Sequence, residues 1–171
     1  NRGVAVATEE NLRAAFAGES QANRRYLAFA KKAEEEGLAQ VAKLFRAVAE
    51  AETVHAHRHL SVLGEVRSTK ENLQAAIDGE NYENTKMYPE FIEQAKADGN
   101  DEAVQSFGYA NAVEKIHEQL YSKVLKKLQA GEEIEEKDYY VCQVCGYTAE
   151  GEAPAVCPVC GAAREKFKLI V

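Results

Sequence analysis

The sequence predicts a mainly α protein, a four-helix bundle followed by a small metal-binding β domain at the C-terminal end. Three observations support this fold class. Apolar residues recur at helical spacing up to about residue 129, a Glu-x-x-His motif occurs twice, and all four cysteines fall within the last 30 residues. We place the bundle at residues 1–137 and the cysteine domain at residues 138–171.

The first two predicted helices form a hairpin. The first begins near Thr8, a capping residue followed by two acids, and ends at Gly37. The second runs from about Leu38 to Leu63 and ends at Gly64. Both carry apolar residues along one face, as expected for helices that pack side by side.

Two further helices follow at the same spacing. The third spans about 68–99, opens with a Ser-x-x-Glu capping box and should kink at Pro89. The fourth spans about 101–129. The acidic, aperiodic segment 131–140 is predicted to be a linker that leads into a strand.

The four helices form an internal repeat with an offset of 62 residues (88 − 26 = 62). The offset joins Tyr26 to Tyr88, Phe29 to Phe91, Gly37 to Gly99, Phe45 to Phe107, Glu52 to Glu114 and His55 to His117. The chain is therefore predicted to contain two hairpins, each with one Glu-x-x-His motif. The match fails at Glu19, which the offset would place on Asn81, so we expect a site that is only pseudo-symmetric.

The two Glu-x-x-His motifs predict a metal site inside the bundle. Each places a carboxylate and an imidazole on one helix face, within an apolar stripe. A buried acid is unfavourable unless a cation neutralises it, and paired motifs of this kind are typical of two-metal carboxylate sites. Oxygen-rich ligation with some imidazole favours iron or manganese. The candidate ligands are Glu19, Glu52, His55, Glu80, Glu83, Glu114 and His117.

An alternative is that these acids form ion pairs with Arg24, Arg25 or Arg46 and that the histidines are ordinary core residues. Five inward acids spread over four helices argue against this alternative. We expect His57 to face solvent and His59 to be a histidine of the bundle interior.

The cysteines form two C-x-x-C pairs, Cys142 with Cys145 and Cys157 with Cys160, each followed by glycine. In a chain without a secretion signal this pattern indicates a metal site before it indicates disulfides. Four thiolates suit tetrahedral zinc or iron, so a structural zinc ribbon stays open on spacing alone.

Charge and hydropathy exclude several classes of function. The net charge of −7 argues against binding to nucleic acid or to an anionic membrane surface. No apolar run approaches the ~18 residues of a membrane span, and no secretion signal opens the chain. We therefore expect a cytoplasmic protein. The hydrophobic fraction of 46% is sufficient for a core.

Taken together, the motifs resemble those of the rubrerythrins along essentially the whole chain. The resemblance rests on Gly18-Glu19-Ser20 with Tyr26, Glu52-x-x-His55, Gly79-Glu80-Asn81-Tyr82-Glu83 with Tyr88-Pro89, Glu114-Lys115-Ile116-His117 and the four cysteines. It implies a ferritin-like di-iron bundle followed by a rubredoxin-like domain. It further implies a peroxidase in which electrons from rubredoxin or its NAD(P)H-dependent reductase enter at the four-cysteine iron and pass to the di-iron centre, where hydrogen peroxide is reduced.

The resemblance also implies roles for single residues. Glu52 and Glu114 would bridge the two irons, and the terminal carboxylates would be Glu19, Glu80 and Glu83. His117 would hold one iron, and His55 would exchange with Glu83 on the other iron between oxidation states. Tyr26 and Tyr88 would donate hydrogen bonds to the carboxylates. The mononuclear iron would be held by Cys142, Cys145, Cys157 and Cys160.

Two rival functions remain. A ferroxidase or iron store would use the same bundle but has no need of the cysteine domain. A plain electron carrier has no need of five buried acids. Oxidation of reduced rubredoxin by peroxide, compared with iron uptake under oxygen, would separate these functions.

The connection between the second and third helices predicts a dimer. In a ferritin-like bundle these helices run parallel, so at ~1.5 Å per residue the two ends that the connection joins are roughly 35 Å apart. Four extended steps from Gly64 to Ser68 reach only about 14 Å. We therefore predict a domain-swapped homodimer, in which each di-iron site takes the first hairpin from one chain and the second from the other.

Overall fold

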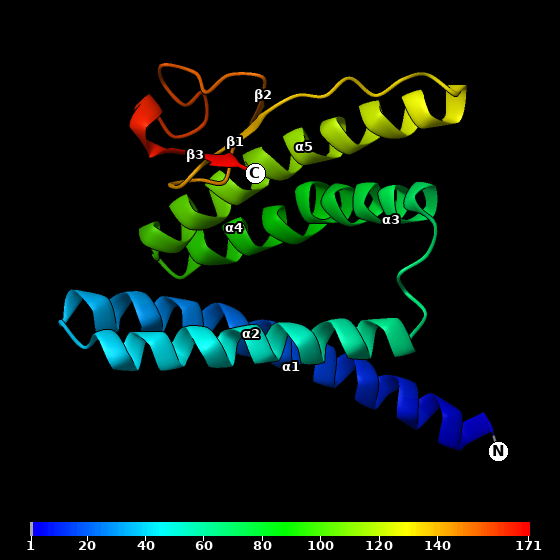
Figure 1. Ribbon diagram of the computed structural model, residues 1–171. Helices are drawn as coiled ribbons and strands as arrows, with labels where there is room; N and C mark the ends of the chain where they lie inside the picture. The colour runs from blue at the N-terminus through cyan, green and yellow to red at the C-terminus, as the bar shows by residue number, and fades with distance from the viewer. Residues whose placement is uncertain (1) are drawn as a thin grey trace. The chain divides into compact units, whose positions relative to one another are not determined.

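The structure, a computed structural model, describes residues 2–171 and divides after Arg67 into two compact units. The first unit is the hairpin of α1 (Arg2–Glu35) and α2 (Ala39–Val62). The second contains α3 (Thr69–Tyr82), the π-helix η1 (Glu83–Met87), α4 (Tyr88–Ala97), α5 (Asp101–Ala130) and a small sheet (Figure 1). The predicted fold class is confirmed. The predicted boundary between residues 137 and 138 lies inside the second unit and stays a prediction.

Helices α1 and α2 pack through small side chains. Among residues 6–67, whose burial the structure describes, the buried side chains are all alanines, at positions Ala30, Ala33, Ala42, Ala49 and Ala56. Small residues allow two helices to approach closely, so the larger apolar side chains are left outside the seam. Those exposed side chains include Phe29, Val41, Leu44, Val48 and Val54. Leu44 and Val54 are each 61% exposed, so a single hairpin leaves much of its apolar surface uncovered.

The start of α1 differs from the prediction. The helix begins at Arg2, six residues before the predicted start at Thr8. A capping residue favours a helix start but does not stop a helix that arrives from upstream, and residues 3–7 contain no proline. The other ends agree within one or two residues. The glycines Gly37, Gly64, Gly99 and Gly131 follow the helices with φ of 75°, 70°, 68° and 71°, a conformation that glycine adopts without strain.

The second hairpin contains the predicted interruption near Pro89, in the form of a π-helical turn. The predicted capping box is present before it, since Ser68 and Glu71 each bond to the other's backbone N–H. Pro89 lies in the first turn of α4, just after η1. A π-helical turn holds one residue more than an α-helical turn.

That extra residue explains the failure of the repeat at the acids. Before η1 the offset between the hairpins is 61 (80 − 19 = 61), and after it the offset is 62 (88 − 26 = 62). Glu19 therefore corresponds to Glu80, and the single offset that placed it on Asn81 was wrong.

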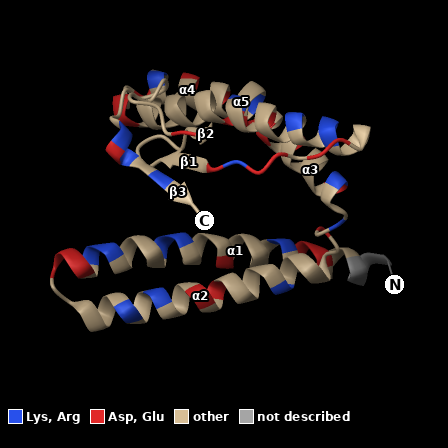
Figure 2. Cartoon of the chain, turned by 45° about the horizontal axis from the view of Figure 1, so that its top comes forward, with Lys and Arg blue, Asp and Glu red and all other residues tan. Residues whose placement is uncertain are grey.

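The C-terminal sheet has three antiparallel strands in the order β2–β1–β3. Their bounds are Tyr139–Cys142 for β1, Thr148–Glu150 for β2 and Phe167–Ile170 for β3, which follows the short 3₁₀ helix η2 (Arg164–Lys166). Residues 132–138 before β1 have no regular structure, and Figure 2 shows this segment largely in the red of acidic side chains. Strand β2 also lies against α5, where Glu150 accepts a hydrogen bond from Lys123.

Candidate metal centres

The first hairpin brings one imidazole and two carboxylates together. Nδ1 of His55 lies 2.9 Å from Oε2 of Glu52 and 3.9 Å from Oε1 of Glu19. Glu52 and His55 are three residues apart on α2, so both side chains leave the same face of that helix. Ligand atoms of all three residues lie within 4.8 Å of one another, the spacing that one metal ion would need.

The second unit repeats this arrangement. Nδ1 of His117 lies 2.9 Å from Oε2 of Glu114 and 3.7 Å from Oε2 of Glu80. These three residues also offer ligand atoms within 4.8 Å of one another. We call Glu19, Glu52 and His55 the first triad, and Glu80, Glu114 and His117 the second triad. The structure thus gathers six of the seven predicted bundle ligands into two groups, one in each unit.

The acids of the second unit crowd one another. Burial, followed by the hydrogen bond and the charge of Glu114 and the charge of Glu83, raises the pKa of Glu80 to about 8. Burial and the charge of Glu114 raise the pKa of Glu83, against the opposing charge of His117. This accumulation of negative charge is what a bound cation would relieve, so the donor set fits a metal centre.

The alternative of arginine partners does not fit the geometry. Within the described residues, the ion partners of the triad acids are the two histidines. Arg46 pairs instead with Glu34, at 2.5 Å. His57 is exposed and belongs to neither triad, as predicted, and His59 is half-buried.

Glu83, the seventh predicted ligand, is the first residue of η1 and lies outside the second triad. With the offset of 61, its counterpart in the first hairpin is Ala22 (83 − 61 = 22). The second unit therefore contributes one more candidate carboxylate ligand than the first. No signal in the apolar spacing marked this difference, since the pattern is intact on both sides of the π-turn.

Tyr26 and Tyr88 occupy equivalent aromatic clusters. Tyr26 lies with Phe29 and Phe45, at ring-centroid distances of 6.3 and 6.2 Å, and Tyr88 lies with Phe91 and Phe107, at 6.4 and 6.2 Å. Burial, and after it the charges of Glu114, Glu83 and Glu80, raise the pKa of Tyr88. Neither hydroxyl bonds to a carboxylate within the part of the chain that the structure describes, so this predicted role stays a prediction.

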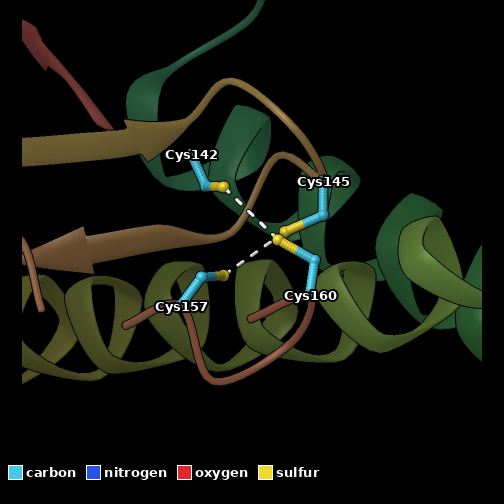
Figure 3. A group of neighbouring side chains, drawn as sticks. All are labelled: Cys142, Cys145, Cys157 and Cys160. Atoms are coloured by element: carbon cyan, nitrogen blue, oxygen red, sulfur yellow. Dashed lines mark hydrogen bonds between the residues drawn. The ribbon is translucent and has the colours of Figure 1, made fainter. Parts of the chain in front are cut away.

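The four cysteines converge on one point (Figure 3). The Sγ atoms of Cys142 and Cys160 are 3.7 Å apart, and those of Cys145 and Cys157 are 3.5 Å apart. All four thiols are free. Gly146 and Gly161, at φ of 85° and 77°, turn the two knuckles so that their N–H groups bond to the carbonyls of Cys142 and Cys157.

The thiols also show why this cluster needs a cation. Burial raises the pKa of Cys142, but hydrogen bonds from the N–H groups of Val144 and Cys145 and with the thiols of Cys160 and Cys145 together bring that pKa down to about 7. Burial raises the pKa of Cys145 and of Cys160. Four thiolates can share this volume only when a metal ion compensates their charge, which fits a four-cysteine metal centre.

Sequence reasoning missed one residue at the second triad. Oγ1 of Thr148, on β2, lies 3.0 Å from Nε2 of His117. The two residues are 31 positions apart, and only the packing of the sheet on α5 brings them together. Nothing in the spacing of the motifs could have shown this contact.

Two family models match the chain. One, described as rubrerythrin, matches residues 10–125, and a second, the rubredoxin-like domain of rubrerythrin, matches residues 140–168. The chain belongs to the rubrerythrin family. Rubrerythrin-2 of Clostridium acetobutylicum is 36% identical, over 94% of this chain and 95% of its own length. Rubrerythrin of Porphyromonas gingivalis is 39% identical, over 94% and 88%.

Nigerythrin of Nitratidesulfovibrio vulgaris is similar both in sequence and in structure. It is 35% identical over 94% of this rubrerythrin and 85% of its own length. A structure of the mixed-valent state of nigerythrin matches with a TM-score of 0.57, covering 95% of this chain and 86% of that chain. A fully reduced, all-ferrous structure matches with a TM-score of 0.57 at 34% identity.

Membership of this family, together with the two donor sets, supports two iron centres in this rubrerythrin. They are a di-iron centre of the bundle and a mononuclear iron centre at the four cysteines. Among its described helices, none is both long and apolar enough to cross a membrane.

Proposed function

We propose that this rubrerythrin is a non-haem iron peroxidase that reduces hydrogen peroxide to water. The observation that carries the proposal is the presence, in one chain, of two Glu-Glu-His triads and a four-thiol cluster. The four cysteines would hold the iron that accepts electrons from rubredoxin or from an NAD(P)H-dependent rubredoxin reductase. Each peroxide takes up two electrons and two protons and yields two water molecules. The four thiols serve as metal ligands and not as disulfides, which suits a cytoplasmic location.

The proposed ligands are those that the sequence predicts. Both triads and Glu83 would hold the di-iron centre, and by resemblance to the family both irons would share Glu52 and Glu114. The cysteine iron takes Cys142, Cys145, Cys157 and Cys160, within a domain that we place at residues 138–171, after a bundle at residues 1–137. The crowding of Glu80, Glu83 and Glu114 supports this assignment because cations would neutralise them.

Bound iron would supply the electrons and the Lewis acidity for cleavage of the O–O bond. The chain's own groups prepare this site. Glu52 and Glu114 are each only 15% exposed, which limits competition from water for their oxygens. Glu83 is the first residue of the π-turn, and burial together with the charge of Glu114 raises its pKa; burial, and after it the charges of the same acids, raises the pKa of Tyr88. By resemblance to the family, His55 would exchange with Glu83 as a ligand, and the exposure of the His55 side chain, at 56%, leaves it room to move.

We further propose that the complete site forms in a domain-swapped homodimer. The N–H groups of Leu63 and Gly64 bond back to His59 and Ser61 and cap α2, so residues 65–68 make the connection to α3. From Gly64 to Ser68 this connection spans at most about 14 Å, too short to return along a parallel helix. The exposed apolar side chains of the first hairpin supply a surface that a second chain would cover. Each site would combine the first triad of one protomer with the second triad of its partner.

The test compares the reaction with hydrogen peroxide and the reaction with oxygen, measured in parallel. Reduced rubredoxin is mixed with the iron-loaded protein and hydrogen peroxide, and its oxidation is followed by its visible absorption. Glu114→Gln should abolish this oxidation and keep the red colour of the cysteine iron, since the two centres have separate ligands. If the protein instead deposits ferric iron under oxygen and ignores peroxide, it is a ferroxidase and the proposal is wrong.

A further inference from the structure

The rubredoxin-like domain of this chain touches the second triad through the side chain of Thr148. Its Oγ1 lies 3.0 Å from Nε2 of His117, on the side of the ring opposite the carboxylates. Two residues along the same strand, Glu150 accepts a hydrogen bond from Lys123 at 2.6 Å. Strand β2 is therefore attached to α5 at two points on one strand face, and the contact with His117 is part of a docked surface.

The hydrogen bonds around Thr148 assign the proton on the imidazole. The Thr148 hydroxyl donates its single hydrogen to the carbonyl of Gly146, at 3.2 Å. Both contacts of Thr148 are hydrogen bonds at the same time only if Nε2 of His117 donates to this oxygen, because the carbonyl of Gly146 cannot donate. A neutral imidazole that carries its hydrogen on Nε2 has its lone pair on Nδ1, and Nδ1 is the atom that faces Glu114 and Glu80.

The first triad lacks such a support. Within the described residues, the polar partners of His55 are Glu52 and Glu19, both through Nδ1. Its side chain is 56% exposed, whereas that of His117 is 26% exposed. The imidazoles of His55 and His117 therefore differ at Nε2, which has the hydroxyl of Thr148 as its partner in His117 and, in the described part of the chain, no such partner in His55.

We propose that Thr148 is a positioning residue of the di-iron site, supplied by the cysteine domain, which fixes the orientation and the tautomer of the His117 ring. The inference rests on the proposed function, in which His117 binds a metal ion through Nδ1. The second bond of Thr148, to the residue after Cys145, makes the position of the ring depend on the first cysteine knuckle. The anchored imidazole is the one that stays in place, and the unsupported His55 is the one that is free to exchange.

The experiment uses the full chain with zinc as a diamagnetic probe, after the four-cysteine site has been filled with zinc. Thr148→Val keeps the shape of the side chain and removes the hydroxyl, and Thr148→Ser keeps the hydroxyl. Lys123→Met is the matched control, since it breaks the other attachment of β2 to α5 without touching His117. Zinc affinity at the carboxylate site is measured by competition with a chelator.

We expect Thr148→Val to lower this zinc affinity roughly tenfold, the usual effect of removing the outer partner of a metal-bound histidine. Thr148→Ser should restore the affinity, and Lys123→Met should leave it unchanged. In NMR spectra of the zinc-loaded protein, the Nε2 proton of His117 should be visible and slow to exchange. It should remain so in Thr148→Ser and be lost to exchange in Thr148→Val.

The outcomes are distinguishable. Wild-type affinity and a retained Nε2 proton signal in Thr148→Val would overturn the role of Thr148. An equal loss in Thr148→Val, Thr148→Ser and Lys123→Met would also overturn it, because the effect would then belong to domain docking. If the wild-type chain binds zinc at the cysteines alone, the proposed di-iron site itself is wrong.

Discussion

Single residues of the second triad carry charges that the metal-free protein cannot balance. Glu80 and Glu114 share one imidazole, and Glu83 adds a third acid nearby. The raised pKa of Glu80, at about 8, means that the folded metal-free chain holds a proton which the unfolded chain releases above its ordinary pKa of 4.5. The stability of the metal-free protein should therefore depend on pH between these two pKa values, 4.5 and about 8.

We expect the thermal midpoint of the metal-free protein to fall as pH rises from about 5 to about 8. In this range the folded state binds more protons than the unfolded state, so stability decreases with pH. Glu80→Gln removes the titrating group and should flatten the dependence. Glu90→Gln, which changes an exposed acid of α4, is the control and should keep the wild-type slope. An unchanged slope in Glu80→Gln would contradict this explanation.

Cys145 offers a second test at the residue scale. Cys145→Ser removes one of the four thiolates and should abolish the red thiolate–iron absorption, with a loss of about one of about three irons per chain. Metal analysis and a visible spectrum measure both effects. The remaining iron should stay with the bundle, because its ligands belong to other elements. A variant that loses all of its iron would show that the two centres are not independent.

Among the elements, η1 has the largest effect on the site. The extra residue of this π-turn sets the rotation of Glu80 and Glu83 relative to Tyr88 and α4. One residue corresponds to a turn of about 100° on an α-helix. A regular α-helix without this extra residue would therefore turn Glu80 and Glu83 away from Glu114 if α4 kept its packing against α5. In that packing the ring centroids of Phe91 and Phe107 lie 5.7 Å apart.

Deletion of Lys86, an exposed residue of η1, should restore a continuous α-helix and abolish metal binding at the carboxylate site. Circular dichroism should show unchanged helix content, and a chelator competition should show the lost affinity. Lys86→Ala, which keeps the length of the segment, is the matched control and should bind metal normally. Wild-type affinity in the deletion variant would show that the π-turn does not orient these acids.

The elements also show what a sequence can and cannot predict. Helix ends were predictable because glycine, alone among residues, adopts positive φ without strain, and because the Ser68 capping box has a local signature. The π-turn was hidden because an inserted residue leaves the apolar spacing intact on each side of it. The contact of Thr148 with His117 was hidden because it depends on how a sheet docks on a helix 31 positions away. The candidate ligands were predictable because each triad combines one local i, i+3 pair with an acid on the neighbouring helix.

At the scale of the whole molecule, the two triads lie in separate units that one short connection joins. A domain-swapped dimer makes a prediction that no other assembly shares. Each of its sites would combine hairpins from different chains, so a chain with a damaged first triad could be complemented by a chain with a damaged second triad.

We expect a mixture of Glu52→Gln and Glu114→Gln chains, unfolded and refolded together, to recover about a quarter of the wild-type peroxidase sites. Random pairing makes about half of the dimers mixed, and each mixed dimer would contain one intact and one doubly damaged site. Each variant refolded alone is the control and should stay inactive. If mixing recovers no activity although mixed dimers form, the hairpins are not exchanged between chains.

The one-residue difference between the hairpins also bears on how ions would fill the bundle. Ala22 stands where the other hairpin has Glu83, so the two halves of the donor set differ by one carboxyl group. Two ions bound by these unequal halves would not be equivalent. The position with the additional carboxyl group would bind its ion first. Loading would then proceed in two separate stages, with a half-filled protein between them.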